Sequence, residues 1–306
     1  MPKLIIHIGS QKTGSTSIQT FLTQNPDKMA EAGLSYVNAG RGPAAHNKLA
    51  FKRDTEQFPR IMNRLVNEVQ NNPDKTHVVS AEMLFTTRMG RAMTEFLPDD
   101  LRAETQIIAY IRRQDKFLEA MYKQVVKTGR FKGTAQEYAQ KREAALMYSK
   151  ILGVYADGFG TDNVTVLPYE RPRFRDGDVI LDMCGHLGMD NVTRDDLPEK
   201  FSNITLSREV SEMLGLISNT TDMNIAELIR VIIRNEADGA FYSGDSYSPL
   251  ERREITDKYV EDNEAVRARF CPDLDHLFDL SDLQGDLDNA GLPPAEQLLR
   301  LRQAQT

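Results

Sequence analysis

The sequence predicts an α/β protein: a three-layer sandwich whose central parallel sheet of about four or five strands is flanked by helices. Short apolar runs rich in β-branched residues recur along the chain, at residues 4–8, 33–37, 75–80, 106–111 and 162–170. Such runs are typical of strands buried in a parallel sheet. Between them lie longer segments whose apolar residues recur at helical spacing. Alternating strands and helices favour a parallel sheet, because each parallel crossover needs a connection of helix length.

A single domain is expected over residues 1–306, with an α/β nucleotide-binding core at 1–205 and a mostly helical C-terminal extension at 206–306. A chain of this length can bury a substantial core. Beyond the helix that begins near Gly14, the predicted helices cover residues 55–71, a segment after Arg113, 134–142, 145–158, 178–188, two segments within 206–236, one or two within 248–270, and 294–303.

Composition narrows the class of partner. Hydrophobic residues make up 40% of the chain and charged residues 27%, which is ordinary for a soluble globular protein. The net charge of −7 argues against binding to nucleic acid or to an anionic membrane surface. Residues 1–20 lack a secretory leader pattern, no 18-residue apolar run occurs, and Cys184 and Cys271 form no CxxC pair. We therefore expect a cytoplasmic protein with reduced thiols and no membrane insertion. The oligomeric state stays unknown.

The most informative stretch joins the first strand to the first helix. The apolar run at 4–8 ends at Gly9, and Gly14 opens a helical segment. Between the two glycines lie polar residues, and a serine–threonine cluster follows. A strand, a glycine-bounded loop and a helix start gather backbone N–H groups at the positive end of a helix dipole. The stretch therefore predicts an anion-binding cradle for phosphate or sulfate.

The position of the lysine within this loop is unusual. A nucleotide-triphosphate P-loop reads G-x-x-x-x-G-K-[ST], with lysine directly after the second glycine. Here Gly9 and Gly14 keep the spacing and Thr16 keeps the hydroxyl, but Ser15 stands where lysine is expected. The cation is Lys12, inside the loop, where its ammonium can reach the bridging oxygen of a bound anhydride. That position suits a leaving group, whereas metal-chelated phosphates favour the ordinary arrangement, so we expect no metal.

The run HIGSQKTGSTSIQ resembles the start of the PAPS-dependent sulfotransferase superfamily, particularly its bacterial P-loop members. The resemblance implies a P-loop-type fold and a loop that holds the 5′-phosphosulfate of 3′-phosphoadenosine 5′-phosphosulfate (PAPS), with PAP as product. It assigns Lys12 a catalytic role beside its role in the cofactor site. The cofactor-binding residues that it implies here are Gln11, Lys12, Thr13, Gly14, Ser15, Thr16 and Ser17.

Two residues are candidates for the catalytic base. Glu82 follows the strand at 75–80, and chemistry in open parallel sheets gathers past the carboxyl ends of strands. Sulfotransferases resemble this arrangement, with a His or Glu base after the corresponding strand. His46 suits proton transfer near neutral pH, and related bacterial proteins carry a His-rich patch before a Leu-Ala pair here. Both have a purely structural alternative: Glu82 as a residue favoured by its own helix dipole, and His46 as a helix-face or capping residue.

A second anion site is expected after the strand at 106–111. Arg112 and Arg113 stand at the start of a helix, where two cations oppose the dipole and favour a bound anion. The segment resembles the sulfotransferase 3′-phosphate motif, in which Arg is followed eight residues later by Ser and then by Tyr. Arg112 and Tyr122 fit that spacing, but Ala120 occupies the Ser position. The missing hydroxyl removes a hydrogen bond worth about 1–3 kcal/mol unless another group replaces it.

Together these features predict a sulfotransferase that transfers a sulfuryl group from PAPS to a hydroxyl or amine of a carbohydrate or small metabolite. Two alternatives stay open at this point. A P-loop kinase using ATP is disfavoured by the displaced Lys12 and by the paired arginines. A non-catalytic nucleotide- or glycan-binding protein of the same fold is favoured chiefly by Ala120.

Overall fold

The computed structural model describes residues 3–131, 133–198 and 246–283, with isolated residues and residue pairs between 207 and 232. Its contacts group the chain into two compact units, which are described separately below. Unit 1 comprises residues 1–112, 147–200 and 262–278, and unit 2 comprises 113–146, 201–261 and 279–306. The helices expected within 206–236 and 294–303 lie outside the continuously described stretches. The single domain expected from the sequence stays a prediction.

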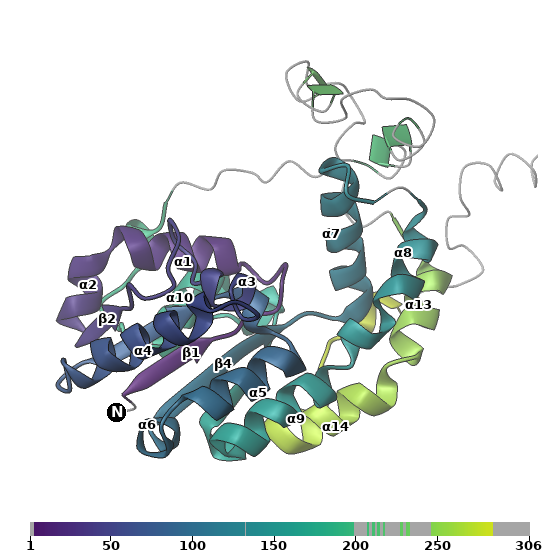
Figure 1. Cartoon of the computed structure of the whole chain (residues 1–306). Coiled ribbons are helices and arrows are strands. Elements are labelled where there is room, and N and C mark those ends of the chain that lie inside the picture. Colours follow the sequence, from purple (N-terminus) through teal and green to yellow (C-terminus); the bar gives the residue numbers. More distant parts are fainter. Residues whose placement is uncertain are drawn as a thin grey trace, which may run out of the picture. The chain divides into compact units, whose positions relative to one another are not determined.

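Unit 1 is built on a five-stranded parallel sheet in the order β2-β3-β1-β4-β5 (Figure 1). This confirms the predicted fold class. The strands are β1 (Leu4–His7), β2 (Leu34–Tyr36), β3 (Thr76–Ser80), β4 (Thr105–Ile111) and β5 (Val164–Pro168). Each coincides with one of the apolar runs, because strands covered on both faces expose no side to water.

The central strand β1 pairs with β3 on one side and β4 on the other. In this register Ile5 lies beside Val78, and His7, the last residue of β1, lies beside Ser80, the last residue of β3. Parallel strands end at the same edge of a sheet. The loop after β1 and the segment after β3 are therefore neighbours.

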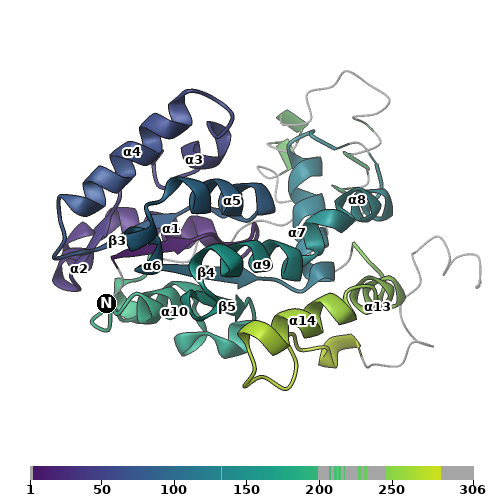
Figure 2. The same cartoon turned by 60° about the horizontal axis from the view of Figure 1, so that its bottom comes forward.

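Helices cover both faces of the sheet. On one face, α1 (Ser15–Gln24), α2 (Pro26–Glu31) and α10 (Val179–His186) share an apolar core with β1, β3 and β4. On the other, α5 (Thr87–Phe96) packs along α9 (Tyr148–Phe159), which contacts β4 and β5 (Figure 2). The remaining helices with residues in unit 1 are α3 (Lys48–Phe51), α4 (Gln57–Gln70), α6 (Asp99–Ala103) and most of α14 (Val260–Phe270).

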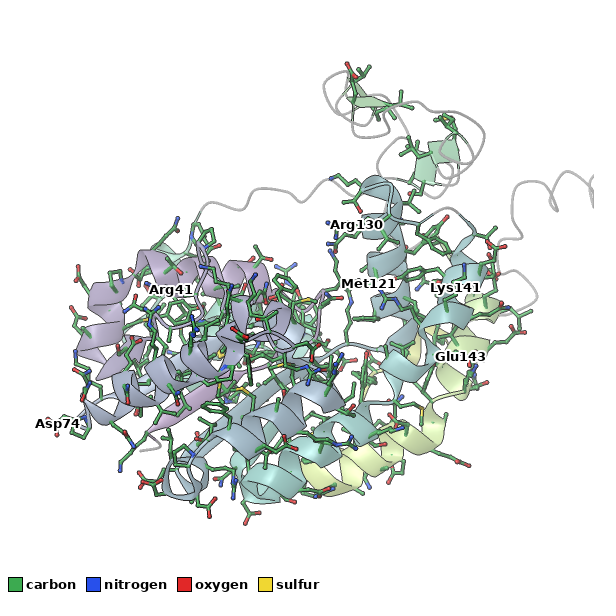
Figure 3. The ribbon with its side chains drawn as sticks, viewed as in Figure 1. Arg41, Asp74, Met121, Arg130, Lys141 and Glu143 are labelled. Carbon is green, nitrogen blue, oxygen red and sulfur yellow. The ribbon has the colours of Figure 1, made fainter. Side chains whose placement is uncertain are left out.

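Unit 2 is helical in its described part, with α7 (Gln114–Lys127), α8 (Ala135–Arg142) and α13 (Pro249–Asp257). Capping boxes begin two of these helices: Thr134 with Glu137 for α8, and Ser248 with Glu251 for α13. Each box satisfies backbone N–H groups that a helix start leaves open. The Lys141 ammonium, labelled on α8 in Figure 3, lies 5.0 Å from the centre of the Phe131 ring.

A network of ion pairs, with Arg113 and Asp115 buried and Asp282 exposed, ties α7 to α13 and to the 3-10 helix at Ser281–Leu283. Arg113 donates to both oxygens of the fully buried Asp115, at 2.7 and 3.0 Å, and its Nη2 donates to Asp282 at 3.0 Å. Arg252 bridges Asp115, at 3.0 Å, and Glu119. Burial alone would raise the pKa of Glu119, but the charge and hydrogen bond of Arg252 outweigh it and lower this pKa to about 2.

Removing one member of this network should be costly. We expect Asp115→Ala to lower the free energy of unfolding by about 3–5 kcal/mol, because it leaves two arginines without their shared buried carboxylate. Urea unfolding followed by circular dichroism measures the change. Asp257→Ala is the matched control, since the Arg253–Asp257 pair at 3.2 Å is exposed on both sides and should contribute at most about 1 kcal/mol. Equal effects of the two substitutions would contradict a structural role for the network.

Candidate functional site

The loop between β1 and α1 is held in an unusual backbone conformation. Gly9, Lys12 and Gly14 all have positive φ, at 62°, 65° and 73°. Glycine adopts this region without strain, whereas a residue with a side chain pays for it. The strained Lys12 therefore depends on its surroundings, and backbone strain of this kind is typical of binding sites. Thr13 Oγ1 donates to the Ser10 carbonyl at 2.6 Å and closes the loop.

Gly14 leaves no room for a side chain at the start of α1. A Cβ atom there would lie 2.8 Å from Val179 Cγ1 and 3.5 Å from the Tyr169 hydroxyl. No side chain caps this helix start, and its first turn contains no acidic residue. Ser15 is buried, while Thr16 and Ser17 are exposed. The first-turn N–H groups and the dipole therefore favour an anion, as the sequence predicts.

Arg112, at the end of β4, lies against the same loop. Its Nη1 donates to the Lys12 carbonyl at 3.0 Å, and its guanidinium lies 5.6 Å from the centre of the Tyr169 ring. The Tyr148 hydroxyl in turn donates to the Arg112 carbonyl at 2.7 Å. The loop thus has a second cation beside Lys12, on a rigid strand end.

Glu82 lies on the other side of the loop, in the 3-10 helix Glu82–Leu84 that follows β3. Its Cα and Cβ atoms are each 3.2 Å from the point where a Cβ of Gly9 would stand. Gln19 Nε2 donates to Oε2 at 2.9 Å, and Asn47 Nδ2 donates to Oε1 at 3.1 Å. Two neutral amides thus fix the half-buried carboxylate beside the loop.

The other candidate base, His46, is fully buried. Its Nε2 donates to the Val37 carbonyl at 2.6 Å, and its Nδ1 accepts from the Ser80 backbone N–H at 3.1 Å. Burial lowers the pKa of His46 to about 4. Of the two roles that the sequence left open, the geometry favours the structural one. The ring fastens the end of β3, directly before Glu82.

The adjacent arginines Arg112 and Arg113 have different surroundings. Arg113 belongs to unit 2, where Asp115 and Asp282 occupy its guanidinium fork. The structure thus assigns Arg113 to internal ion pairs, in place of the phosphate contact that the sequence predicted. Ala120 lies half-buried on α7, also in unit 2. In unit 1, Gln11 is half-buried and its amide contacts Met83 Sδ at 3.1 Å.

Sequence reasoning did not select three polar residues around Glu82. Gln19 and Asn47 hold its carboxylate, and His7 Nδ1 lies 2.8 Å from Ser80 Oγ. Burial lowers the pKa of His7 to about 3. A signal existed for His7, because a histidine is unexpected within a fully apolar strand. Gln19 ends the run HIGSQKTGSTSIQ that carries the family resemblance, although no role was assigned to it. Asn47 carries no signal, since amides are common at helix starts.

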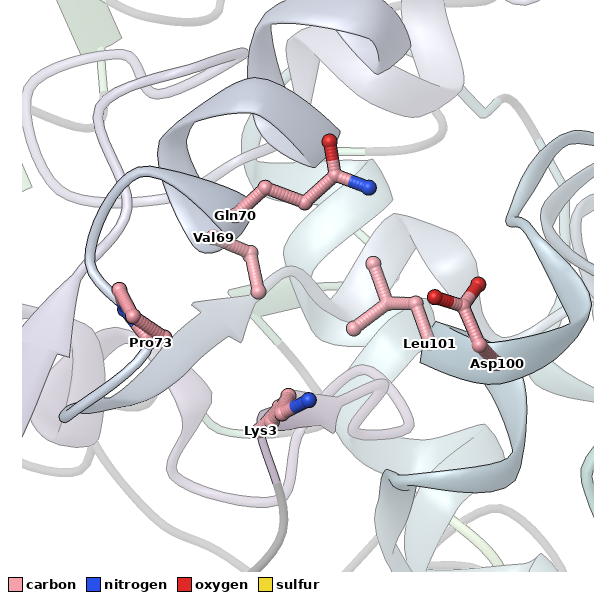
Figure 4. Close-up of a pocket in the computed structure, with 6 residues that line it drawn as sticks. All are labelled: Lys3, Val69, Gln70, Pro73, Asp100 and Leu101. Atoms are coloured by element: carbon pink, nitrogen blue, oxygen red, sulfur yellow. The ribbon is translucent and has the colours of Figure 1, made fainter.

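A separate hollow of about 130 Å³ lies at the opposite edge of the sheet, where β1 and β3 begin (Figure 4). It contains none of the predicted site residues. Its lining residues are Lys3, Val69, Gln70, Pro73, Asp100 and Leu101.

Within the described residues, no three His, Cys, Asp or Glu side chains gather to hold a metal ion. Among the helices of the described residues, none is both long enough and apolar enough to cross a membrane.

The buried His46 predicts a pH effect on stability. The fold holds this ring neutral, with a pKa of about 4, against about 6.5 in the unfolded chain. The unfolded state therefore binds more protons between these values, so stability is full above pH 6.5 and is lost as the pH falls toward 4. From His46 we expect a loss of about 3 kcal/mol in the free energy of unfolding, measured by urea unfolding at each pH. Burial also lowers the pKa of His7, to about 3, so His7 adds a loss of its own over the same pH range. His46→Gln should remove only the part due to His46, and a slope unchanged from wild type would contradict the assignment; exposed His276→Gln is the control.

The solved structures similar to this chain include the following three. A sulfotransferase from Alicyclobacillus acidocaldarius superposes with a TM-score of 0.51 and 17% sequence identity, covering 93% of this chain and 99% of its own. The sulfotransferase domain from the curacin biosynthetic pathway follows, with a TM-score of 0.38, 12% identity and coverage of 84% and 97%. Retinol dehydratase in complex with androsterone and PAP has a TM-score of 0.33, 13% identity and coverage of 89% and 84%.

Sequence relatives say less. No family model matches the chain. An uncharacterized protein of Archaeoglobus fulgidus is 37% identical over 86 residues, which is 28% of this chain and 23% of that protein. The matched stretch is thus less than a quarter of that relative. The structural likeness to the Alicyclobacillus enzyme, in contrast, spans nearly all of both chains. This chain has a fold similar to that of the Alicyclobacillus sulfotransferase.

Proposed function

We propose that this protein is a PAPS-dependent sulfotransferase that acts on a hydroxyl or amine of a carbohydrate or another small molecule. One observation carries the proposal: Glu82, a carboxylate, lies directly against Gly9 of the anion-binding loop. A base and a leaving-group cradle are thus neighbours at the carboxyl edge of the sheet, where ligands of such folds bind.

The residues of the loop fit the phosphosulfate end of PAPS. Lys12 and the backbone N–H groups of Gly14 to Ser17 would surround it, together with Gln11 and Thr13. The positive φ angles and the exclusion of a side chain at Gly14 support a loop shaped for a bound group. Arg112, braced against the Lys12 carbonyl, adds a positive charge for a phosphate of the donor.

When bound, PAPS supplies the sulfuryl group: the acceptor oxygen or nitrogen bonds to sulfur as the bond from sulfur to the 5′-phosphate oxygen breaks. Glu82 takes the proton of the acceptor, and the amides of Gln19 and Asn47 hold the carboxylate in place for that transfer. Lys12 stabilises negative charge on the departing oxygen. His46 keeps the end of β3 fixed.

An ATP-dependent kinase is not favoured, because Ser15 occupies the position that a nucleotide-triphosphate loop gives to lysine. A cytoplasmic location is part of the proposal, and the two cysteines, Cys184 and Cys271, support it because both are buried free thiols.

Lys12→Ala tests the leaving-group role. We expect it to lower turnover by about 10²–10³, as the removal of other transition-state charge contacts does. PAP release from PAPS, measured with a panel of sugar and phenol acceptors, gives the rate. Lys48→Ala, at an exposed position on α3, is the matched control and should keep the wild-type rate. A Lys12→Ala rate equal to wild type would remove Lys12 from the mechanism.

Glu82→Gln tests the base. The amide keeps the shape of the side chain but cannot take a proton, so we expect kcat to fall by about 10²–10⁴. Affinity for PAP should stay within about twofold of wild type, because the carboxylate faces the acceptor and not the nucleotide. A parallel His46→Gln variant should lose less activity than Glu82→Gln. The reverse order would transfer the base role to His46.

A further inference from the structure

The surroundings of Glu82 contain a polar atom that the fold leaves unsatisfied. The described part of the chain has five buried side-chain polar atoms without a partner: His7 Nε2, Asn47 Oδ1, His77 Nδ1, Ser211 Oγ and Ser246 Oγ. One of them, Asn47 Oδ1, belongs to a side chain that is bonded to Glu82. Buried polar atoms are nearly always paired, so an open acceptor beside the proposed base indicates a missing hydrogen-bond donor.

The orientation of the Asn47 amide is fixed by its neighbour. Its nitrogen donates to Glu82 Oε1 at 3.1 Å, and an ionised carboxylate can only accept. The other end of the amide is therefore the oxygen, an acceptor that has no donor. Asn47 precedes α3, but its side chain does not cap that helix. Helix formation therefore gives no reason for an open acceptor here.

A second unpartnered atom, His7 Nε2, lies on the neighbouring strand β1, near Gly9. This nitrogen lies 3.8 Å from the point beside Gly9 where a Cβ would stand, and Glu82 Cβ lies 3.2 Å from that point. The other ring nitrogen is already engaged with Ser80 Oγ. The loop residue Gly9 thus has an open histidine nitrogen and the proposed base near it.

We propose that Asn47 determines acceptor specificity: its Oδ1 accepts a hydrogen bond from a second hydroxyl or amine of the acceptor, on the carbon next to the one that is sulfated. This rests on the proposed function. Both amide atoms of Asn47 are attached to one carbon, so Oδ1 lies close to Glu82 Oε1. Groups on adjacent carbons can reach both atoms together. The substrate class is then a vicinal diol or amino alcohol, as in a sugar or polyol.

This role differs measurably from mere support of Glu82. If Asn47 only positioned the carboxylate, its loss would slow every acceptor equally. If Oδ1 also binds the second donor, the loss of Asn47 slows vicinal acceptors further than it slows those with one hydroxyl. A site built to hydrogen-bond a polar group discriminates strongly against analogues that lack that group. Comparing wild type and Asn47→Ala, each with acceptors that have or lack the second hydroxyl, isolates this one contact.

The test compares vicinal cyclohexanediol, cyclohexanol and the cyclohexanediol whose hydroxyls lie across the ring, each with PAPS. We expect wild type to favour the vicinal diol over both others by about 100-fold in kcat/KM. Asn47→Ala should reduce that preference to about threefold or less. Asn67→Ala, the same change at an exposed asparagine of α4, should keep the wild-type preference. Thermal melting of each variant checks that it is folded.

Each contrary outcome separates the inference from the function on which it rests. Equal rates with all three acceptors, or a uniform loss in Asn47→Ala, overturn the acceptor role of Asn47 and leave the sulfotransferase proposal in place. Titration of the protein–PAP complex with the vicinal diol gives a second readout. If PAP binds and the diol is neither bound nor sulfated, the inference is wrong. If PAP itself does not bind, the proposed function is at fault.

Discussion

The parallel pairing of β1 with β3 is the constraint on which the site depends. It places His7 beside Ser80 at the carboxyl edge of the sheet, so the loop after one strand and the first residues after the other must meet. Gly9 makes this contact possible, because any side chain there would stand 3.2 Å from the backbone of Glu82. The neighbouring pairing of β1 with β4 likewise brings Arg112 against Lys12. Loop, carboxylate and arginine are thus positioned by strand register more than by contacts among themselves.

Neutral polar groups then fix what the register brings together. His46 and His7 are both buried, with pKa values lowered to about 4 and 3, so at neutral pH neither adds charge under the site. They hold the end of β3 through Ser80, while two amides hold Glu82. Positive charge is left to Lys12, Arg112 and the helix dipole. This division suits an anionic leaving group on one side of Gly9 and a proton acceptor on the other.

The sequence was most informative where a residue's role follows from local pattern. The five strands and the loop could be read from apolar runs and glycine spacing, and the position of Glu82 followed from its place after β3. Roles that depend on long-range contacts could not. Asp282 is 169 positions from Arg113, and no local sequence pattern shows that its carboxylate pairs with the Arg113 guanidinium. Similarly, the structural role of His46 depends on its hydrogen bonds to two backbone groups, which the sequence does not reveal. Only the folded structure shows that Asn47 Oδ1 lacks a hydrogen-bond donor.

Isothermal titration of the purified protein with PAP, and separately with ATP and magnesium, tests directly whether the loop after β1 holds the sulfuryl donor. We expect micromolar binding of PAP, lost in Lys12→Ala and Arg112→Ala, and no binding of ATP. Binding of ATP with no response to PAP would contradict it, since the loop would then hold a metal-chelated triphosphate. No binding of either nucleotide would equally contradict a donor site at this loop.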